Sequence, residues 1–253
     1  MIKEVKKSIK YNISKLRGYV SGDIRGLREN PCYSMKSDLV YEKIENFDGE
    51  KEVLEELLKR VGKGDVFFDV GANFGLYTVP IGISRKNVKV YSFEPIRDWF
   101  KMLKENMCIN KVKYANPFMI ALGKKVENKK MIRRNIVGSG MASYNYTKNY
   151  EKKVGDKSDR VSVRVSTLDA LTKSNIVPIP NIIKIDVEGA EYDVVRGGEK
   201  TLSSKKCKKV LVEMHKTGSK KMAEKRLKSL GFSIESSWGR SSEVLQMWVK
   251  QKL

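Results

Sequence analysis

Residues 65–94 read DVFFDVGANFGLYTVPIGISRKNVKVYSFE and decide the fold expected of this chain. The apolar run at 65–70 is typical of a strand buried on both faces, and residues 88–93 predict a second strand. Between them a glycine-containing loop leads into a helix. A strand, a glycine loop, a helix and a second strand with an acid at its end predict a nucleotide-type site in a parallel α/β sheet.

The loop residues themselves suit close contact with a ligand. Gly71 allows a sharp turn, and Gly75 lets the next helix begin against the ligand with no Cβ in the way. Asn73 is one of the few residues besides glycine that tolerate a positive φ. Backbone N–H groups at the helix start can then face a carboxylate or a phosphate. Alone, two glycines are also compatible with an ordinary turn.

Acidic residues at the two strand ends strengthen the ligand reading. Glu94 follows Gly75 by 19 residues, where its carboxylate can accept the hydroxyls of a ribose, and Asp69 ends the first strand. The full G-x-G-x-x-G spacing is absent, which favours a ligand with adenosine and an amino-acid tail but no pyrophosphate. The alternative is that Glu94 only caps the following helix. Ala121, at the end of the next strand, suits either an adenine contact or plain packing.

The rest of the chain continues the alternation of strands and helices. Such alternation predicts a doubly wound parallel sheet with helices on both faces and ligands beyond the carboxyl ends of its strands. Helices are expected at 52–61, 97–109, 192–202 and 220–230, and further strands at 114–121, 161–165, 182–186, 210–214, 232–236 and 244–249.

Two parts of the chain depart from this rhythm. Residues 1–50 form a basic N-terminal extension, with a strand pair expected around 39–47. Residues 51–253 form the Rossmann-like domain, interrupted at about 122–165 by polar, basic and glycine-rich sequence. We expect this insertion to be a hairpin with a loop.

Carboxylates gather at the end of the strand at 182–186. Asp186 and Glu188 emerge there on the substrate side of the ligand cleft, and Glu191 falls in the first helical turn, where it suits the helix dipole. Lys184 lies inside the otherwise apolar strand, so we expect an acid beside it. Three carboxylates so close together need a positive neighbour: Lys184, a sulfonium, a metal ion or a basic group of the substrate.

His215 is the single histidine of the chain, and it ends the next strand. A lone histidine is often structural. This one is placed by sheet order beside Asp186 and Glu188, and a histidine with a near-neutral pKa is a natural general base for a hydroxyl proton. We therefore interpret His215 as catalytic, with Glu213 as the residue that orients it.

These motifs resemble the FkbM-type family of S-adenosylmethionine-dependent methyltransferases. The resemblance implies a class I methyltransferase fold with seven strands, the last antiparallel, and methylation of a hydroxyl on a sugar, glycolipid or secondary metabolite. Carried over by position, the cofactor residues are Asp69, Gly71, Asn73, Gly75 and Glu94, and the acceptor-side residues are Asp186, Glu188, Glu213 and His215. The matching stretches are FFDVGANFGLYTV (67–79), VYSFEPIRDWFKMLKENMCIN (90–110), STLDAL (166–171), IIKIDVEGAEYDVVRGGEKTL (182–202) and LVEMH (211–215).

The formal net charge of +21 leaves the partner open. It favours anionic partners, or it is only a soluble lysine coat. RNA methylation is one alternative, since residues 124–164 hold twelve Lys or Arg against four acids, with Tyr144, Tyr146 and Tyr150 among them. A non-catalytic domain at an anionic membrane is another, because Tyr11, Ile13, Leu16 and Tyr19 interrupt the basic N-terminus.

Composition narrows the remaining possibilities. Three widely spaced cysteines with no CxxC pair argue against a disulfide framework and a zinc site, and no metal is predicted. No apolar run reaches the roughly 20 residues of a membrane helix, so we expect a cytoplasmic protein, with peripheral membrane contact as an alternative. The expected partner is a small-molecule or glycan hydroxyl acceptor, and the oligomeric state is left open.

Overall fold

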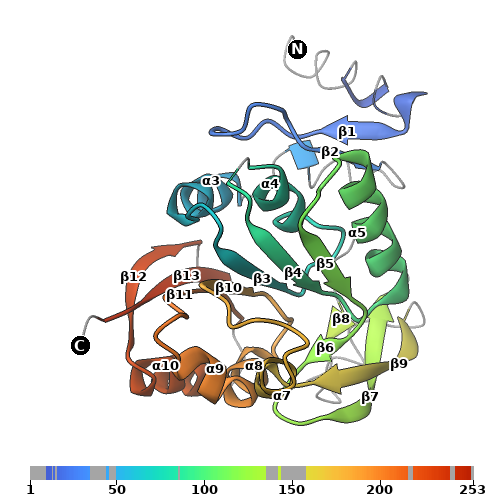
Figure 1. Ribbon diagram of the computed structural model, residues 1–253. Helices are drawn as coiled ribbons and strands as arrows, with labels where there is room; N and C mark the ends of the chain where they lie inside the picture. Colours follow the sequence, from blue (N-terminus) through green and yellow to red (C-terminus); the bar gives the residue numbers. More distant parts are fainter. Residues whose placement is uncertain are drawn as a thin grey trace.

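The computed structural model describes residues 10–12, 14, 16–34, 44–45, 50–84, 86–134, 142–143, 158–215, 219–239 and 243–251. Within these ranges a large sheet carries helices on both faces, with a smaller sheet beside it (Figure 1). Several predicted features lie outside the described residues: Ile13, the three tyrosines of the insertion and most of the strand pair at 39–47. Residues 44–45 of that pair are described, and they are helical rather than extended.

The large sheet has seven strands in the order β12-β13-β11-β10-β3-β4-β5. Neighbouring strands are parallel except at β13, which runs antiparallel to both β11 and β12. The predicted α/β fold with an antiparallel last strand is therefore confirmed. The strands are β3 (Val66–Val70), β4 (Lys89–Phe93), β5 (Ala115–Phe118), β10 (Ile182–Ile185), β11 (Lys209–His215), β12 (Phe232–Trp238) and β13 (Glu243–Lys250).

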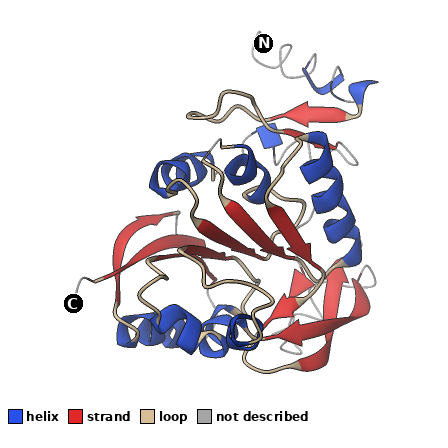
Figure 2. Ribbon diagram, viewed as in Figure 1, coloured by secondary structure: helices blue, strands red, loops and turns tan. Residues whose placement is uncertain are grey.

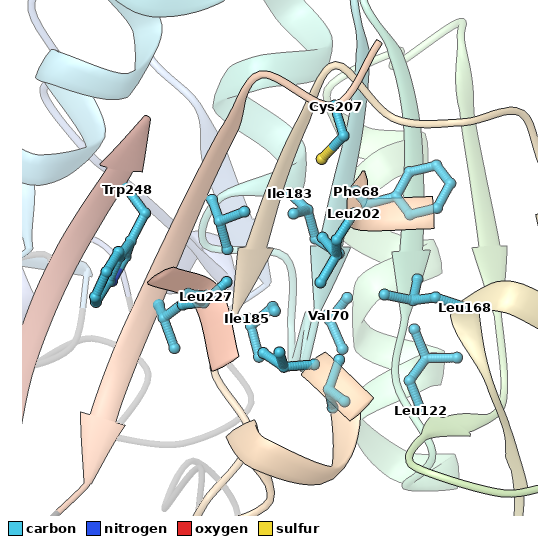
Figure 3. Packing of buried hydrophobic residues seen from close by; sticks show 14 of the residues in the cluster. Phe68, Val70, Leu122, Leu168, Ile183, Ile185, Leu202, Cys207, Leu227 and Trp248 are labelled. Atoms are coloured by element: carbon cyan, nitrogen blue, oxygen red, sulfur yellow. The ribbon is translucent and has the colours of Figure 1, made fainter. Parts of the chain in front are cut away.

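Alternation along β3 explains why helices cover both faces. Phe67 belongs to a buried cluster with residues of α3 and α4, whereas Phe68 belongs to the cluster on the other face, which includes residues of α7 to α10 (Figure 3). Successive strand residues point to opposite faces, so an all-apolar run needs cover on both sides. The helices are α3 (Lys51–Arg60), α4 (Thr78–Ile83), α5 (Arg97–Ile109), α7 (Leu168–Lys173), α8 (Glu191–Gly197), α9 (Glu199–Ser203) and α10 (Ser219–Ser229).

The predicted third strand, 114–121, divides between the two sheets. Its first half is β5 at the edge of the large sheet, and its end is β6 (Ala121–Leu122) in the smaller one. Pro117 lies within β5. Proline has no N–H to donate to a neighbouring strand, and an edge strand tolerates it because one side of that strand has no neighbour. The sequence prediction of one continuous strand was wrong at this point.

The predicted helix at 192–202 also divides, into α8 and α9 at Gly197–Gly198. Two adjacent glycines are poor helix formers. The glycine at 197 is explained by the close approach of the segment after β6, since a Cβ on Gly197 would lie 1.9 Å from the carbonyl oxygen of Gly123. The glycine pair thus lets α8 lie directly against the turn that leaves β6.

The smaller sheet has the order β6-β9-β7-β8 and contains the predicted hairpin (Figure 2). β7 (Glu127–Arg134) pairs antiparallel with β9 (Ser158–Ser166), and β8 (Ala142–Ser143) adds to the edge of β7. Met131, Val163 and Val165 are buried in a cluster with Trp99 of α5. The insertion is therefore packed onto the start of α5 rather than standing apart from the domain.

The N-terminal segment is fastened to α5 by asparagine side chains. β1 (Tyr19–Ser21) and β2 (Cys32–Ser34) form an antiparallel pair. Asn106 accepts a hydrogen bond from the Ser34 N–H (2.8 Å) and donates one to the Phe74 carbonyl (2.8 Å).

The domain boundary at residue 50 stays a prediction. Of the described helices, none is both long and apolar enough to cross a membrane.

Replacing Asn106 with alanine should destabilise the protein by about 2–6 kcal/mol, because two buried backbone groups would lose their partner at roughly 1–3 kcal/mol each. Urea unfolding of the full chain measures this. Lys101→Ala, at an exposed position of the same helix, is the matched control and should stay within about 0.5 kcal/mol of wild type. Equal stability of the two variants would contradict the role given to Asn106.

Candidate active site

A pocket lies at the carboxyl ends of β3, β4 and β10, where doubly wound sheets bind their ligands. The loop after β3 and the chain after β10 lie against each other and both contribute to the pocket. β6, β7 and the first turn of α5 complete it. The described lining residues are Val70, Gly71, Asn73, Phe93, Glu94, Pro95, Trp99, Ala121, Leu122, Met131, Asp186, Val187 and Glu188.

The loop takes the left-handed backbone that its sequence predicted. Gly71, Asn73 and Gly75 have φ values of 79°, 51° and 97°. At Gly71 the space also requires glycine, because a Cβ would lie 1.8 Å from the carbonyl oxygen of Asp186. The N–H groups of Gly71 and Ala72 both donate to the Phe93 carbonyl, at 3.0 and 3.1 Å, so the loop is fixed to the end of β4.

Glu94 lines the pocket and also supports its backbone. One carboxylate oxygen accepts the Asn73 N–H (2.9 Å) and the other accepts the Ile96 N–H (2.8 Å). Burial raises the pKa of Glu94 to about 7, against the lowering effect of these two hydrogen bonds. A carboxylate has about four acceptor positions, so two remain for hydroxyls of a ligand. The capping and ligand-binding readings of Glu94 are therefore compatible.

Asp69 and Gly75 lie outside the pocket wall. The Asp69 side chain is fully buried, accepts a hydrogen bond from Thr78 Oγ1 (2.6 Å) and lies 3.6 Å from the Lys184 ammonium. Thr78 in turn shares a hydrogen bond with Ser92 on β4. This places Asp69 beneath the loop as a support, and its predicted direct contact with a cofactor stays a prediction. Gly71, Asn73, Glu94 and Ala121 do reach the pocket.

The chemistry of the pocket fits a positively charged nucleoside. Its described lining has the carboxylates Glu94, Asp186 and Glu188 among apolar walls, and neither lysine nor arginine is in that set. A pyrophosphate would lack a basic partner there, whereas adenosine joined to a sulfonium suits both the walls and the charge. Trp99 and Met131 were missed as lining residues. Trp99 follows Glu94 by five positions, which was an available signal, but Met131 reaches the pocket only through the fold of the insertion.

The buried Lys184 forms an ion pair with the partly buried Asp186, which lines the pocket. The ammonium lies 2.9 Å from the Asp186 carboxylate and 3.6 Å from that of Asp69, which confirms the acid expected beside Lys184. Burial would raise the pKa of Asp186, but the Lys184 charge and hydrogen bonds from Glu213 and Lys184 lower it to about 2. Asp186 is therefore ionised at neutral pH.

Glu213 has the opposite protonation state. The charge of Asp186 and burial together raise the pKa of Glu213 to about 11, so it keeps its proton and donates it to Asp186. The sequence reading made Glu213 the partner of His215. The structure pairs Glu213 with Asp186 instead, because both side chains face the same buried space at the ends of adjacent strands.

His215 is held between two glutamates. Its Nδ1 lies 2.6 Å from Glu191 Oε1, and its Nε2 lies 3.6 Å from Glu188 Oε2. Glu191 is fully buried and also accepts hydrogen bonds from the Gly189 N–H and the Ser219 hydroxyl. The sequence reading assigned Glu191 only to the helix dipole, so this partner of His215 was missed.

These carboxylates change the expected titration of His215. Burial would lower its pKa, but the hydrogen bond to Glu191 and the charges of Glu188, Glu191 and Asp186 raise the pKa of His215 to about 9. The near-neutral pKa expected from the sequence was wrong. At neutral pH the ring is an imidazolium.

Three of these side chains are close enough together to bind a metal ion. Asp186, Glu213 and His215 each offer one ligand atom, and these atoms lie within 4.8 Å of one another. Lys184 lies 2.9 Å from Asp186, so one cation already faces this group of side chains. The sequence prediction of no metal ion stays a prediction.

The chain is similar to methyltransferases in sequence and in fold. The family described as "Methyltransferase FkbM domain" matches residues 69–234. The hexuronic acid methyltransferase AglP of Haloferax volcanii is 30% identical over 195 residues, which are 76% of this chain and 74% of AglP. An rRNA methylase structure from Streptococcus thermophilus superposes with a TM-score of 0.51 at 10% identity, covering 80% of this chain and 96% of that one.

Binding of S-adenosylmethionine should strengthen with pH through the ionisation of Glu94. The carboxylate is the better acceptor for hydroxyls and the better neighbour for a sulfonium, and it forms as pH rises through about 7. Between pH 6 and 8 the affinity should rise roughly tenfold, since that is the gain in ionised fraction. Isothermal titration calorimetry of the cofactor across this range measures the effect.

Glu94→Gln should bind more weakly at pH 8 and lose most of the pH dependence. Glu199→Gln is the matched control, because Glu199 pairs with Arg226 away from the pocket, and it should follow the wild-type curve. A Glu94→Gln variant that is folded by circular dichroism and retains the full tenfold rise would rule out Glu94 as the titrating group.

Proposed function

Since the chain belongs to the FkbM methyltransferase family, we propose that it methylates a hydroxyl oxygen of a sugar, using S-adenosylmethionine as its methyl donor. The observation that carries the proposal is the 3.6 Å distance from His215 Nε2 to Glu188, because Glu188 lines the pocket that suits this cofactor, whereas His215 lies behind Glu188 and outside the described lining. The name of AglP supports a sugar, because a hexuronic acid is a sugar with several hydroxyls and one carboxylate.

The chain's own residues divide into a cofactor side and an acceptor side. When bound, S-adenosylmethionine supplies a methyl group on a positively charged sulfur, which is a good leaving centre. Gly71 and Asn73 present their backbone to it, and Glu94 would accept its ribose hydroxyls. Asp186 and Glu188 favour a positive ligand by charge. With this chemistry in the cofactor, the protein contributes mainly alignment and proton removal.

His215 is the residue that we assign to proton removal. As the acceptor oxygen forms its bond to the methyl carbon, the bond from that carbon to sulfur would break and sulfur would keep the electron pair. The O–H bond of the acceptor would break as well, and its proton would pass to Nε2. Nδ1 keeps its own proton in the hydrogen bond to Glu191, so the tautomer with a free Nε2 is favoured. The resulting imidazolium is stabilised by Glu188 and Glu191. The neutral ring must form first, and with a pKa of about 9 it is roughly 1% of the population at pH 7.

The rate of methyl transfer should therefore rise with pH up to about 9. Below that value kcat should increase close to tenfold per pH unit, because only neutral His215 accepts the proton. Glu191→Gln removes the charge bonded to Nδ1 and should move the rising limb about one unit or more toward lower pH. His215→Ala should lower kcat by about 100-fold or more.

Glu224→Gln serves as the control for the pH profile. Glu224 bonds Gln246 on the outer part of the sheet and should leave the limb where it is. The general-base assignment fails if His215→Ala, folded and binding cofactor normally, keeps the wild-type rate across pH. A limb that stays fixed in Glu191→Gln would exclude Glu191 as the group that sets this titration.

The acceptor itself is tested by transfer of tritiated methyl from labelled cofactor. Matched glycans that end in a hexuronic acid or the corresponding neutral hexose should both be compared, alongside RNA and lipid fractions of cell extract. We expect label on the sugar as an alkali-stable ether, the product of a hydroxyl. Label lost in mild alkali would indicate a methyl ester on the carboxylate, and label in RNA would indicate an RNA methyltransferase. Either result would overturn the proposal.

A further inference from the structure

Lys184 is out of place in its strand by composition alone. β10 is the fully buried run Ile-Ile-Lys-Ile in the centre of the sheet, and the lysine side chain is 4% exposed. Lysine is almost never buried this deeply unless it is paired. Its pairing register puts it opposite Asp69 of β3 and Leu211 of β11. Since side chains alternate along a strand, Lys184, Asp69 and Asp186 share one face.

The ammonium joins parts of the site that belong to different strands. It donates to Asp186 Oδ2 (2.9 Å) and to the carbonyl of Gly71 in the cofactor loop (3.4 Å), and it lies 3.6 Å from Asp69 Oδ1. On its fourth side it lies 4.8 Å from the centre of the Tyr77 ring, whose hydroxyl donates to Glu50. The Lys184 side chain thus contacts Asp69 beneath the cofactor loop, Gly71 in that loop and Asp186 on the acceptor side.

The charges around Lys184 are mostly negative. The charges of Asp186, Asp69 and Glu50 act on Lys184. The charge of Lys184 in turn lowers the pKa values of Glu94 and Glu213. Burial would lower the pKa of Lys184, but these carboxylates raise it above its ordinary value, so the ammonium is permanent. His215 is the other cation near Asp186, and it must lose its proton to act as a base. Lys184 then remains as the cation that balances Asp186.

We propose that Lys184 is a positioning residue for methyl transfer, because its ammonium ties the cofactor loop at Gly71 to the carboxylate of Asp186 beside His215. The proposal rests on the proposed function of this site. Its physical content is alignment: one buried side chain contacts both the loop on the cofactor side and the carboxylate on the acceptor side, and a shift of about 1 Å between reacting groups costs on the order of 100-fold in rate.

Lys184→Met keeps the length of the side chain and removes its charge and donors. We expect kcat to fall about 100-fold, whereas KM for the cofactor changes less than about fivefold, because the loop remains bonded to Phe93. Lys184→Arg keeps the charge, so its kcat should be at least about tenfold higher than that of Lys184→Met. Lys184→Gln, which keeps a donor without the charge, should resemble the methionine variant.

Lys250→Met is the control for removing a partly buried lysine that bonds backbone carbonyls. The Lys250 ammonium donates to the carbonyls of Leu202 and Ser204 and lies 4.8 Å above the Phe232 ring, but it contacts no part of the pocket wall. Its loss should lower stability and leave kcat near wild type. If Lys184→Met and Lys250→Met lower kcat equally, the effect is general destabilisation and the proposal is wrong.

A second readout follows Asp186 directly and needs no acceptor. With carboxyl-labelled aspartate, and Asp186→Asn for assignment, the carbon resonance of Asp186 is followed from pH 3 to 9. In wild type Asp186 should stay ionised across this range, because its pKa is lowered to about 2, and in Lys184→Met it should titrate above about 4. A wild-type midpoint above 4 would overturn the proposal even if no Lys184 variant folds.

The two proposals fail in distinguishable ways. If the label is found in RNA or as a methyl ester, the sugar hydroxyl assignment is wrong, while the Lys184 variants still reduce transfer to that acceptor and still change the Asp186 titration. If transfer to a sugar hydroxyl is observed and Lys184→Met keeps the wild-type kcat, the positioning role is wrong and the proposed function stands.

Discussion

The loop after β3 crosses the end of β10 so closely that a Cβ on Gly71 would lie 1.8 Å from the carbonyl oxygen of Asp186. This contact makes the cofactor side and the acceptor side two surfaces of the same wall. Below it, the Lys184 ammonium lies between Asp186 and Asp69. Neither side of the site can therefore move without disturbing the other, which is the preorganisation that a methyl transfer with little covalent help from the protein requires.

Such a buried group of charges is poorly explained as a source of stability. Removing two charges from water costs several kcal/mol per ion, and apolar residues of similar volume often serve stability as well or better. The chain instead keeps Asp186 ionised and Glu213 protonated side by side, with their pKa values at about 2 and 11. Neighbouring carboxyl groups driven this far apart are typical of sites that handle protons.

Much of this could be predicted from the sequence because it depends on local pattern. The glycine loop, the bounds of α5 and the strand ends at Glu94 and Asp186 follow from periodicity and turn chemistry. The Glu191–His215 pair could not be predicted, because it depends on where the first residue of α8 lies relative to the end of β11. The pKa of His215 was mispredicted for the same reason, since burial and charged neighbours decide it rather than residue type.

The contrast between the surface and the pocket bears on how an acceptor is oriented. If the acceptor is the sugar of the proposed function and carries a negative charge, the net charge of +21 would attract it from a distance. At short range Asp186 and Glu188 line the pocket and repel a carboxylate, whereas a neutral hydroxyl meets no such penalty. An anionic sugar would thus be attracted as a whole but turned so that a hydroxyl, and not its carboxylate, approaches His215. The same two forces favour an ether as the product.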